Sequence, residues 1–513
     1  MAGQDRFAAP WTRRRFLKAA ATGAVGVLGI GSAYELLAGT VAAAPARSTV
    51  KVGSSPAERR QFRSRPDLSP PRITVTHGAA AGAAASTAPG LIFLTPANGQ
   101  GPNGPLIVDD SGEPVWVAPH SGKNTTNLQV LQYRGAPVLA WWEGKITVGY
   151  GRGDYVIMDR SYRELRRVQA GHGYAGDLHE FVITPEGTAL FDIFNIRPGQ
   201  VQTDRGPAAG LLMEGVVQEV DIATGEVLFE WHSADHVGTG ESYFAMPRGF
   251  GEPADYFHIN SIDVDVDGNL LVSSRHCWTV YKVDRRSGAI LWRLGGKRSD
   301  FTFAPGAHFS WQHHVRHHSG NRLTVFDNGA SGPQTITEPR TRGLLLDLDP
   351  AAKTATLVRA YVHPGNLVCP SQGTVQLLPH GHVFMGWGSQ PYYSEFSAGG
   401  ERLFDANFPT AGSYRAFRFP WTGLPTEPPA IAVGRRAAGE LTVYASWNGA
   451  TEVATWEVLA GPGADRLTRV ATAPRSGFET AIVARAFEAY VAARALDRAG
   501  RPLGTSVARA VAG

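Results

Sequence analysis

The hydrophobic and polar positions of this chain alternate in short runs, and two kinds of run recur along it. The first kind is an apolar residue and an aspartate, then a turn, then a strand that often carries tryptophan. Its clear copies are VDDSGEPVW (108–116), VDIATGEVLFEW (220–231) and VDRRSGAILWRL (283–294). Its weaker copies are MDRSYREL (158–165), LDPAAKTATLV (348–358) and FSAGGERLF (396–404). Alternation with a period of two residues predicts β-strands, so we expect an all-β chain.

The second kind of run is a hairpin with glycine at its turn. It appears as TPEGTALFD (184–192), DVDGNLLVS (265–273), HSGNRLTVF (318–326) and LPHGHVFMG (378–386). Because the two kinds interleave about every sixty residues, each unit holds two hairpins, or four strands. Four antiparallel strands per repeat are typical of a propeller blade. We therefore predict a six-bladed β-propeller over residues 91–425, with five and seven blades as the alternatives.

In a propeller the first strand of each blade lines the central channel. His179, His258 and His313 each stand near the start of a hairpin of the second kind. The repeat therefore predicts that these three histidines meet near the axis of the ring.

The composition changes after Trp421, where the segment TGLPTEPP ends the repeats. Residues 430–513 carry the short alternating runs LTVYASW, ATWEVLAG, ETAIVA and AYVAARALD. Short strands of this kind predict a fibronectin type III-like β-sandwich. It carries no obvious chemical cluster.

The N-terminal residues have the pattern of a targeting segment. Residues 12–18 read TRRRFLK, and an apolar run rich in glycine and alanine follows, up to Ala44. We expect residues 1–44 to be a twin-arginine signal peptide, with an uncleaved membrane anchor as the alternative. We then expect 45–90 to be an Ala/Pro/Ser-rich linker and a first strand, and the protein to be secreted or held at the cell surface. No further apolar span of about 20 residues follows, so no membrane span is expected in the mature chain.

The net charge limits the classes of partner that we expect, and the two cysteines allow two states. The formal net charge is +4, but without residues 1–44 the chain has 44 basic and 43 acidic residues. A balance so close to neutral gives no reason to expect a nucleic acid partner. The two cysteines, Cys277 and Cys369, are either paired in an oxidising compartment or two buried thiols.

The richest chemistry lies in YFHINSIDVDVDGNLLVSSR (256–275) and WQHHVRHHSGNRLTVFDNG (311–329). His258 and Asn260 are two apart on a predicted strand, so they share a face, and Arg275 closes the next strand. Neutral nitrogen bases beside a fixed cation suit an oxyanion ligand and a nucleophilic imidazole. The HHVRHH run is alternatively a metal site, but no carboxylate or cysteine at ligand spacing supports it, so no metal is expected. The DVDVDGN segment resembles a calcium loop, yet its strand-turn-strand pattern favours turn chemistry.

These motifs resemble those of the bacterial arylsulfate sulfotransferase family, in its actinobacterial branch. The resemblance covers residues 90–425 and is carried by GPLIVDDSGEPVW, PVLAWWEG, DLHEFVITPEGTAL, YFHINSIDVDVDGNLLVSSR, LWRLGGK, QHHVRHHSGNRLTVFDNG and SQGTVQLLPHGHVFMGWGSQPYYSEF. It implies a six-bladed propeller that moves a sulfuryl group from a phenolic sulfate ester to a phenolic acceptor. The transfer passes through a sulfohistidine, with ping-pong kinetics, and needs neither a cofactor nor a nucleotide sulfate donor.

The resemblance also implies roles for individual residues. The catalytic residues would be His313 as the nucleophile, with His258, His179 and Arg275. The substrate-binding residues would be Asn260, Thr374 and His314. Which of His313 and His314 faces the channel stays open, because adjacent strand residues point in opposite directions. Which of His179 and His258 transfers the proton also stays open.

Two other functions remain compatible with the residues alone. One is a propeller hydrolase or lyase that acts on an anionic saccharide with the same histidines and arginine. The other is a non-catalytic propeller that binds a ligand. Trp142, Trp387, Tyr392 and Tyr393 are either packing residues of the blades or an aromatic wall for an aryl substrate.

Overall fold

The computed structural model describes residues 59–77, 87–97, 104–119, 121–245, 252–332, 334–408, 412–437, 440–485 and 488–511. The predicted signal peptide, residues 1–44, lies outside these ranges. The described residues are all-β, as predicted. Their helical segments are three single turns of 3-10 helix: η2 (Ser233–Asp235), η3 (Thr239–Glu241) and η4 (Pro379–Gly381).

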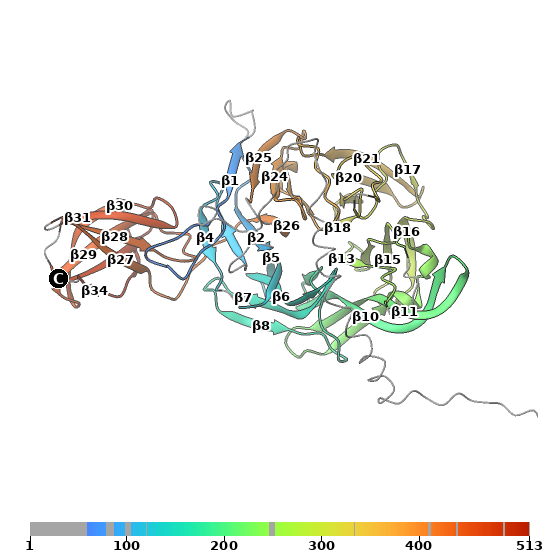
Figure 1. Cartoon of the computed structure of the whole chain (residues 1–513), viewed down its shortest axis with the longest axis horizontal. Coiled ribbons are helices and arrows are strands. Elements are labelled where there is room, and N and C mark those ends of the chain that lie inside the picture. The colour runs from blue at the N-terminus through green and yellow to red at the C-terminus, as the bar shows by residue number, and fades with distance from the viewer. Residues whose placement is uncertain are drawn as a thin grey trace, which may run out of the picture. The chain divides into compact units, whose positions relative to one another are not determined.

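Six sheets of four or five strands lie in the described part of residues 74–419 (Figure 1). The first to be completed along the chain is β5 (Asn124–Tyr133), β6 (Ala136–Thr147), β7 (Tyr150–Met158) and β8 (Glu164–Val168). The next is β9 (Phe181–Ile183), β10 (Thr188–Thr203), β11 (Gly206–Asp221) and β12 (Val227–His232). The third is β13 (Ile259–Val264), β14 (Leu270–Ser274), β15 (Thr279–Val283) and β16 (Ile290–Gly295).

The fourth sheet is β18 (His313–His318), β19 (Arg322–Asp327), β20 (Arg342–Asp349) and β21 (Thr354–Tyr361), with the short β17 (Thr302–Phe303) at its edge. The fifth is β22 (Thr374–Leu377), β23 (Val383–Gly386), β24 (Tyr392–Phe396) and β25 (Arg402–Asn407). It gains a fifth strand from the N-terminal side of the chain, β1 (Thr74–His77), which pairs with β25.

The last sheet joins distant parts of the chain. Its strands are β26 (Gly412–Phe419), then β2 (Leu91–Ala97), β3 (Leu106–Val108) and β4 (Pro114–Val117). The pairing of β26 with β2 brings residues more than three hundred positions apart into register, from Leu91 with Phe419 to Ala97 with Gly412. Backbone hydrogen bonds therefore link the two ends of this part of the chain.

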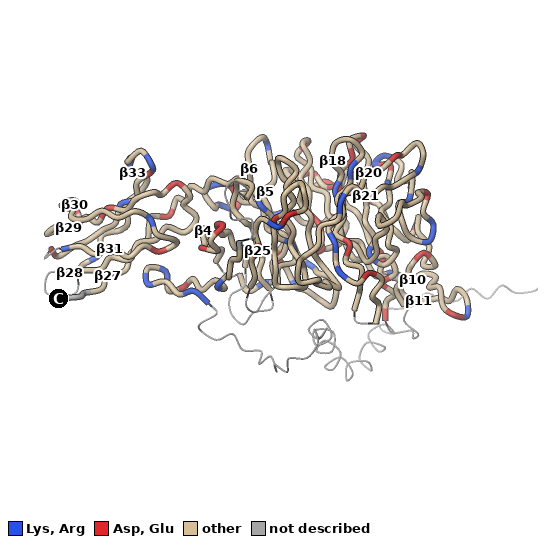
Figure 2. The backbone as a smooth tube through the Cα atoms, turned by 90° about the horizontal axis from the view of Figure 1, so that it is seen from above, with Lys and Arg blue, Asp and Glu red and all other residues tan. Residues whose placement is uncertain are grey.

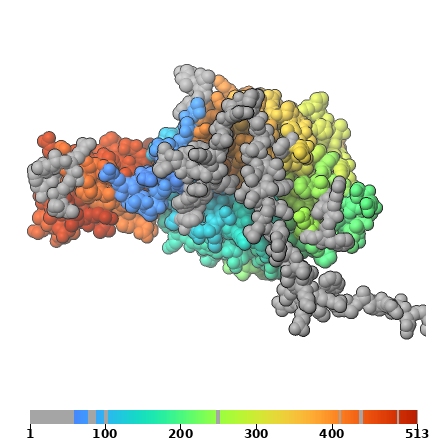
Figure 3. Space-filling model, viewed as in Figure 1, coloured from blue at the N-terminus to red at the C-terminus, as the bar shows by residue number. Residues whose placement is uncertain are grey.

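The six sheets form a closed, propeller-like ring. Their first strands contact one another in turn, in the order β26, β5, β9, β13, β18 and β22, and β22 contacts β26 again. The colours in Figure 3 follow the chain around this ring from cyan through green and yellow to orange. Residues at the start of the first strands therefore face a common centre.

Hydrophobic residues fill the spaces between neighbouring sheets. Six buried clusters each draw side chains from two consecutive sheets. Between the β5–β8 and β9–β12 sheets, for example, the rings of Tyr155 and Phe181 stack with their centroids 4.4 Å apart. Burial of these apolar faces is the main force that holds such sheets together.

The glycine turns of the predicted hairpins are confirmed at two places next to the site. Gly268 joins β13 to β14 with a φ of 81°, and Gly320 joins β18 to β19 with a φ of 76°. Only glycine reaches this left-handed region without steric cost, so these residues fix where the strands turn back.

Residues beyond the ring form two more sheets. One is β27 (Ala430–Ala437), β28 (Glu440–Ser446) and β31 (Glu479–Arg485). The other is β30 (Arg466–Pro474), β29 (Thr455–Gly463), β32 (Tyr490–Leu496) and β33 (Pro502–Thr505), with β34 (Arg509–Ala510) also paired to β32. A single buried cluster draws on both sheets, including Val443 and Trp456.

Three further features concern the cysteines, the distribution of charge and the membrane-spanning helices that the sequence analysis considered. Cys277 and Cys369 are both buried free thiols, so they do not pair with each other. Basic and acidic residues are interspersed along the backbone (Figure 2). Among the described residues, no helix has the length and apolar character needed to cross a bilayer.

Candidate active site

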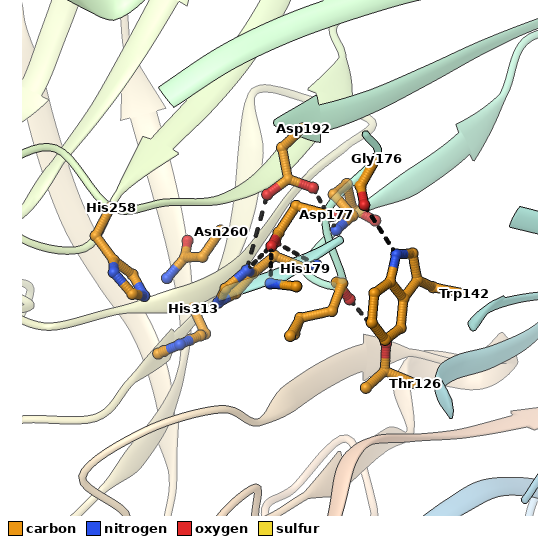
Figure 4. Close-up of polar contacts among 12 residues, drawn as sticks. Thr126, Trp142, Gly176, Asp177, His179, Asp192, His258, Asn260 and His313 are labelled. Carbon is orange, nitrogen blue, oxygen red and sulfur yellow. Dashed lines mark hydrogen bonds and ion pairs between the residues drawn. The ribbon is translucent and has the colours of Figure 1, made fainter. Parts of the chain in front are cut away.

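The three histidines predicted to meet do lie together in the centre of the ring (Figure 4). His179 lies two residues before the start of β9, His258 directly precedes β13, and His313 is the first residue of β18. The rings of His179 and His258 are 5.2 Å apart and nearly perpendicular. The ring of Tyr414 on β26 lies 5.5 Å from that of His179 and 6.5 Å from that of His313, measured between centroids.

The imidazole of His313 is held in one tautomer by an amide. Its Nδ1 lies 2.7 Å from Oδ1 of Asn328, whose own Nδ2 donates to the carbonyls of Cys369 and Gln372 at 2.7 and 3.0 Å. The amide oxygen therefore faces the ring, and Nδ1 carries the proton. Nε2 is left with its lone pair, toward which the backbone N–H of Gln372 points at 3.2 Å. Burial and the nearby Arg275 guanidinium hold the pKa of His313 well below its usual range, so the ring is neutral.

The other two histidines are held by carboxylates. Nδ1 of His258 lies 2.6 Å from Oδ2 of Asp255, and Nδ1 of His179 is bonded to Oδ1 of Asp177. Burial would raise the pKa of Asp255, but the neighbouring imidazoles of His258 and His276 lower it to about 2. An ionised carboxylate at Nδ1 fixes the ring and stabilises it when it gains a proton.

Arg275 is fixed at the edge of this group. Its Nη1 donates to Nε2 of His276 at 2.8 Å, and its Nη2 donates to the carbonyl of Pro370 at 2.8 Å. Its guanidinium also lies over the indole of Trp311, 5.2 Å from the ring centroid. Burial holds the pKa of His276 well below its usual range, so its Nε2 is a neutral acceptor for the arginine.

Asn260 lies on β13 between the histidines, fully buried. Its Nδ2 donates to the carbonyl of Gln312 at 2.7 Å, which orients the amide. Its Oδ1 is buried and has no hydrogen-bond partner among the described residues. Asn260 therefore offers the site one remaining N–H and an acceptor oxygen.

β-Bulges orient these side chains at the starts of the first strands of the sheets. The pairing of β13 with β14 shifts register between Ile259 and Ser261, and that of β18 with β19 shifts between His313 and Arg316. His314, inside the second bulge, has a left-handed φ of 47°. Bulges re-aim side chains in this way and are frequent next to active sites.

His314 and Thr374 have other neighbours. The ring of His314 lies 5.7 Å from that of Phe417, and burial together with Arg316 and Arg415 holds its pKa well below its usual range. The Oγ1 of Thr374 accepts the backbone N–H of Ala416 at 3.3 Å. Both contacts are with the β26 side of the ring, whereas the guanidinium that lowers the pKa of His313 is that of Arg275.

With this geometry established, sequence comparison decides the family. The family model described as arylsulfotransferase (ASST) matches residues 129–409, more than half of the chain. The chain belongs to the arylsulfotransferase (ASST) family. Membership supports a sulfotransferase-like function, with aryl sulfates and phenols as the implied substrates. The matched range includes His179, His258, Asn260, Arg275 and His313.

Comparison with solved structures finds more distant likenesses to this family member. A protein of unknown function from Bacteroides caccae is 15% identical, with 64% of this chain and 98% of that chain covered and a TM-score of 0.39. Virginiamycin B lyase from Staphylococcus aureus is 6% identical, with 80% and 98% covered and a TM-score of 0.30. A streptogramin B lyase is 11% identical, with 76% and 87% covered and a TM-score of 0.30. No curated protein matches the sequence of the chain.

Sequence reasoning missed the residues that orient the histidines of this arylsulfotransferase-family site. They are Asp177, Asp255 and Asn328; His276, which orients Arg275, was also missed. Asp177 stands two residues before His179, a spacing that puts the two side chains on one face of an extended segment. Asn328 follows β19 and meets His313 through the β18–β19 hairpin, whose bulge between His313 and Arg316 the alternating pattern did not predict.

Two clusters of carboxylate and imidazole atoms have the composition of metal sites. They are Asp177, His179 and Asp192, and Asp255, His258 and His276. In each cluster a carboxylate is already bonded to Nδ1 of a histidine, as in an oriented imidazole. We assign these contacts to the positioning of the rings.

The other candidate metal motifs are accounted for by protein partners. Of the HHVRHH histidines, His317 lies 3.5 Å from Asp265, and His318 is 3.0 Å from Thr324. In DVDVDGN, the carboxylates of Asp265 and Asp267 each lie 2.6 Å from Nζ of Lys282. These aspartates serve the turn and its ion pair.

The tryptophans and tyrosines singled out in the sequence are mainly packing residues. Trp142, Trp387 and Tyr393 are completely buried between sheets. Nε1 of Trp142 donates to the carbonyl of Gly176 at 3.0 Å (Figure 4). These three side chains are therefore not a wall for an aryl substrate.

Proposed function

We propose that this protein is an arylsulfate sulfotransferase that carries the sulfuryl group on His313. It moves the group from a phenolic sulfate ester to a phenolic acceptor, with ping-pong kinetics and without a nucleotide sulfate donor. One observation carries the proposal: of the three central histidines, His313 alone is held at Nδ1 by a neutral amide, while His179 and His258 are held by carboxylates.

The amide keeps His313 suited to attack. The carboxylates beside His179 and His258 stabilise those rings once they gain a proton, whereas Asn328 stabilises the neutral ring of His313, which has a lone pair to offer. The pKa of His313, well below its usual range through burial and Arg275, adds to this effect. Nε2 then attacks sulfur as the bond between sulfur and the aryl oxygen breaks, and the departing phenolate takes a proton from His179 or His258.

The second half of the reaction reverses these steps. The acceptor phenol gives its proton to the same imidazole as its oxygen attacks sulfur, and the bond between Nε2 and sulfur breaks. Asp177 and Asp255 stabilise the imidazolium that forms, which suits His179 and His258 to proton transfer.

Positive charge and fixed donors face the oxygens of the transferring group. Sulfuryl transfer resembles phosphoryl transfer, in which charge spreads over equatorial oxygens and the protein contributes position and charge. Arg275 is held by His276 and Pro370, so it meets this charge without reorganising. The N–H of Gln372, which points at Nε2 at 3.2 Å, is placed to bind a sulfuryl oxygen once Nε2 is occupied.

The proposal also covers the architecture of the chain and its export by the twin-arginine route. We take the six sheets as the six blades of one propeller, and the assignment to the actinobacterial branch rests on the sequence motifs. The strand orders β27-β28-β31 and β30-β29-β32-β33 support a fibronectin type III-like sandwich after it. The TRRRFLK segment supports export by the twin-arginine route.

Transfer from p-nitrophenyl sulfate to phenol tests the proposal. We expect the wild type to release nitrophenol and form phenyl sulfate with parallel lines in double-reciprocal plots. His313→Ala loses transfer, while the control His318→Ala, on the same strand but bonded to Thr324, keeps it. Full transfer by His313→Ala would overturn the assignment of the nucleophile.

A further inference from the structure

Asp192 is a buried carboxyl group beside the histidine cluster that the proposed reaction does not use. It stands on β10, is fully buried, and lies next to Asp177 and His179 (Figure 4). Its Oδ1 accepts the backbone N–H of Glu180 at 2.9 Å, whereas its Oδ2 is buried and has no hydrogen-bond donor among the described residues. That Oδ2 lies 3.9 Å from Nδ1 of His179.

Asp177 is the carboxylate that already holds the imidazole of His179. Its Oδ1 accepts from Nδ1 and from the backbone N–H of His179, and its Oδ2 accepts the backbone N–H of Gly151. Three donors satisfy the two oxygens of an ionised carboxylate, so Asp177 carries a negative charge. The backbone N–H of Asp177 also donates to the carbonyl of Asp192 at 2.9 Å, which ties the two residues together.

A second negative charge on Asp192 would have no cation to balance it. In the described part of the chain, the ion-pair contacts of Asp177 and Asp192 are with His179 alone. The two buried arginines of β18 and β26 are paired with Glu180. An unpaired buried charge is costly, so such a carboxyl takes a proton instead. Burial, with Asp177 and Glu180 adding to it, accordingly holds the pKa of Asp192 well above its usual range.

The other neighbours of Asp192 that the structure describes offer it no free cation either. Burial holds the pKa of Tyr155 and Tyr414 well above the usual value, so both phenols are neutral. The residue opposite Asp192 on β11 is the apolar Val217, and His258 is held by its own carboxylate. The titratable and charged groups around this carboxyl are Tyr155 on β7, Asp177, His179 and Glu180 before β9, His258 before β13, Arg316 on β18, and Tyr414 and Arg415 on β26.

We infer that Asp192 is a neutral carboxylic acid that shares its proton with Asp177, so that the two aspartates present a single negative charge to His179. Side-chain oxygens of the two lie within 4.8 Å of each other. The inference rests on the proposed function, in which His179 is one of the two histidines that can transfer the proton. Beside one charge, His179 can gain a proton and release it again, whereas two charges would hold the proton on the ring. Asp192 is thus a positioning residue that acts through Asp177.

Infrared spectroscopy tests the protonation of Asp192 directly and needs no substrate. The spectrum of the wild type minus that of Asp192→Asn, both at pH 7, should contain the C=O band of a protonated carboxyl group. In the wild type this band should disappear as the pH is raised through the pKa of Asp192. The control Asp347→Asn, in an exposed carboxylate that pairs with Arg322 at 2.7 Å, should change carboxylate bands alone. A difference spectrum of Asp192→Asn with carboxylate bands alone would overturn the inference, whether or not the protein transfers sulfuryl groups.

Replacements at the two aspartates should affect transfer from p-nitrophenyl sulfate to phenol differently. Asp177→Asn should lower kcat about 10²-fold, because the charge that stabilises the imidazolium of His179 is lost. Asp192→Ala removes the group that shares its proton with Asp177, and should lower kcat about tenfold with KM within about twofold of the wild type. Asp192→Asn keeps the shape and the donor of the neutral acid, and should restore most of that loss.

The pH dependence of kcat separates this role from a purely structural one. In the wild type, kcat should fall at alkaline pH as Asp192 loses its proton and the second charge holds the proton on His179. Asp192→Asn cannot ionise, so it should keep its kcat to higher pH. A loss in Asp192→Asn as large as that in Asp177→Asn, or the same alkaline fall as in the wild type, would overturn the inference and leave the sulfotransferase proposal intact.

Discussion

Nδ1 of His258 lies 2.6 Å from a carboxylate oxygen of Asp255, and the same carboxylate lies near His276. Replacement Asp255→Asn keeps the shape but removes the charge that stabilises a protonated His258. We expect kcat for transfer between phenols to fall about 10²-fold, the lower range of general acid–base catalysis. Steady-state kinetics with a phenol of high pKa, which needs proton transfer most, would measure the loss.

A matched replacement excludes a general effect of lost charge. Asp235→Asn removes an exposed carboxylate that pairs with Arg197 at 3.3 Å and contacts none of the three histidines in the described contacts, so it should leave kcat unchanged. If Asp255→Asn retained wild-type kcat with poor leaving groups, Asp255 would have no part in proton transfer.

Single residues were predictable where the chemistry lies in a local motif. His258, Asn260 and Arg275 stand at the ends of two strands joined by one turn, so their proximity follows from a single hairpin. Asn328 ends the same β18–β19 hairpin that His313 begins, but a bulge there shifts the register, and Gln372 reaches His313 from the segment before β22. The spacing of residues along the chain does not predict such contacts.

A buried carboxylate links several of the first strands of the sheets, which face the centre of the ring. Glu180, which directly precedes β9, contacts Arg316 on β18 at 2.7 Å and Arg415 on β26 at 3.0 Å. Burial would raise the pKa of Glu180, but the two guanidinium groups lower it. Arg415 also donates to the carbonyl of Asn260 at 3.0 Å, so the network holds a site residue in position.

Replacement Glu180→Ala should therefore destabilise the fold strongly. It leaves two buried guanidinium groups without their carboxylate, and such a loss costs about 3–5 kcal/mol. Unfolding by urea, followed by tryptophan fluorescence, would measure the free energy of unfolding. The comparison variant Asp347→Ala breaks an exposed ion pair with Arg322 and should cost less than about 1 kcal/mol. Equal small losses in both variants would contradict the role of the network.

The hairpins were predictable because each depends on a local turn and an alternating pattern. The closure of the ring was not, because the pairs β1–β25 and β2–β26 join residues far apart in the sequence. The repeat indicated a ring but held no information on which segment completes the last sheet.

At the scale of the whole molecule, buried titratable groups of both kinds set the pH dependence of stability. Burial holds the pKa of His276, His313 and His314 well below the usual value of 6.5. Burial also raises the pKa of Asp192 well above its usual range, with Asp177 and Glu180 adding to the effect. The histidines favour folding less as the pH falls below 6.5, whereas Asp192 acts in the opposite direction.

A single replacement isolates one of these contributions. Below pH 6.5 the unfolded chain gains a proton at His314 that the folded chain does not, so folding loses stability as the pH falls. His314→Asn removes this loss. The free energy of unfolding of the wild type should therefore fall relative to the variant by up to about 1.4 kcal/mol per pH unit between pH 6.5 and 5. A difference independent of pH would show that His314 titrates normally.

The most direct test of the central claim is the mass of the protein after a brief pulse with p-nitrophenyl sulfate, quenched in alkaline denaturant. We expect the wild type to gain one sulfuryl group, mapped to the peptide that contains His313, and His313→Ala to gain none. Release of nitrophenol with no gain in mass, or a sulfuryl group on another residue, would contradict transfer through His313.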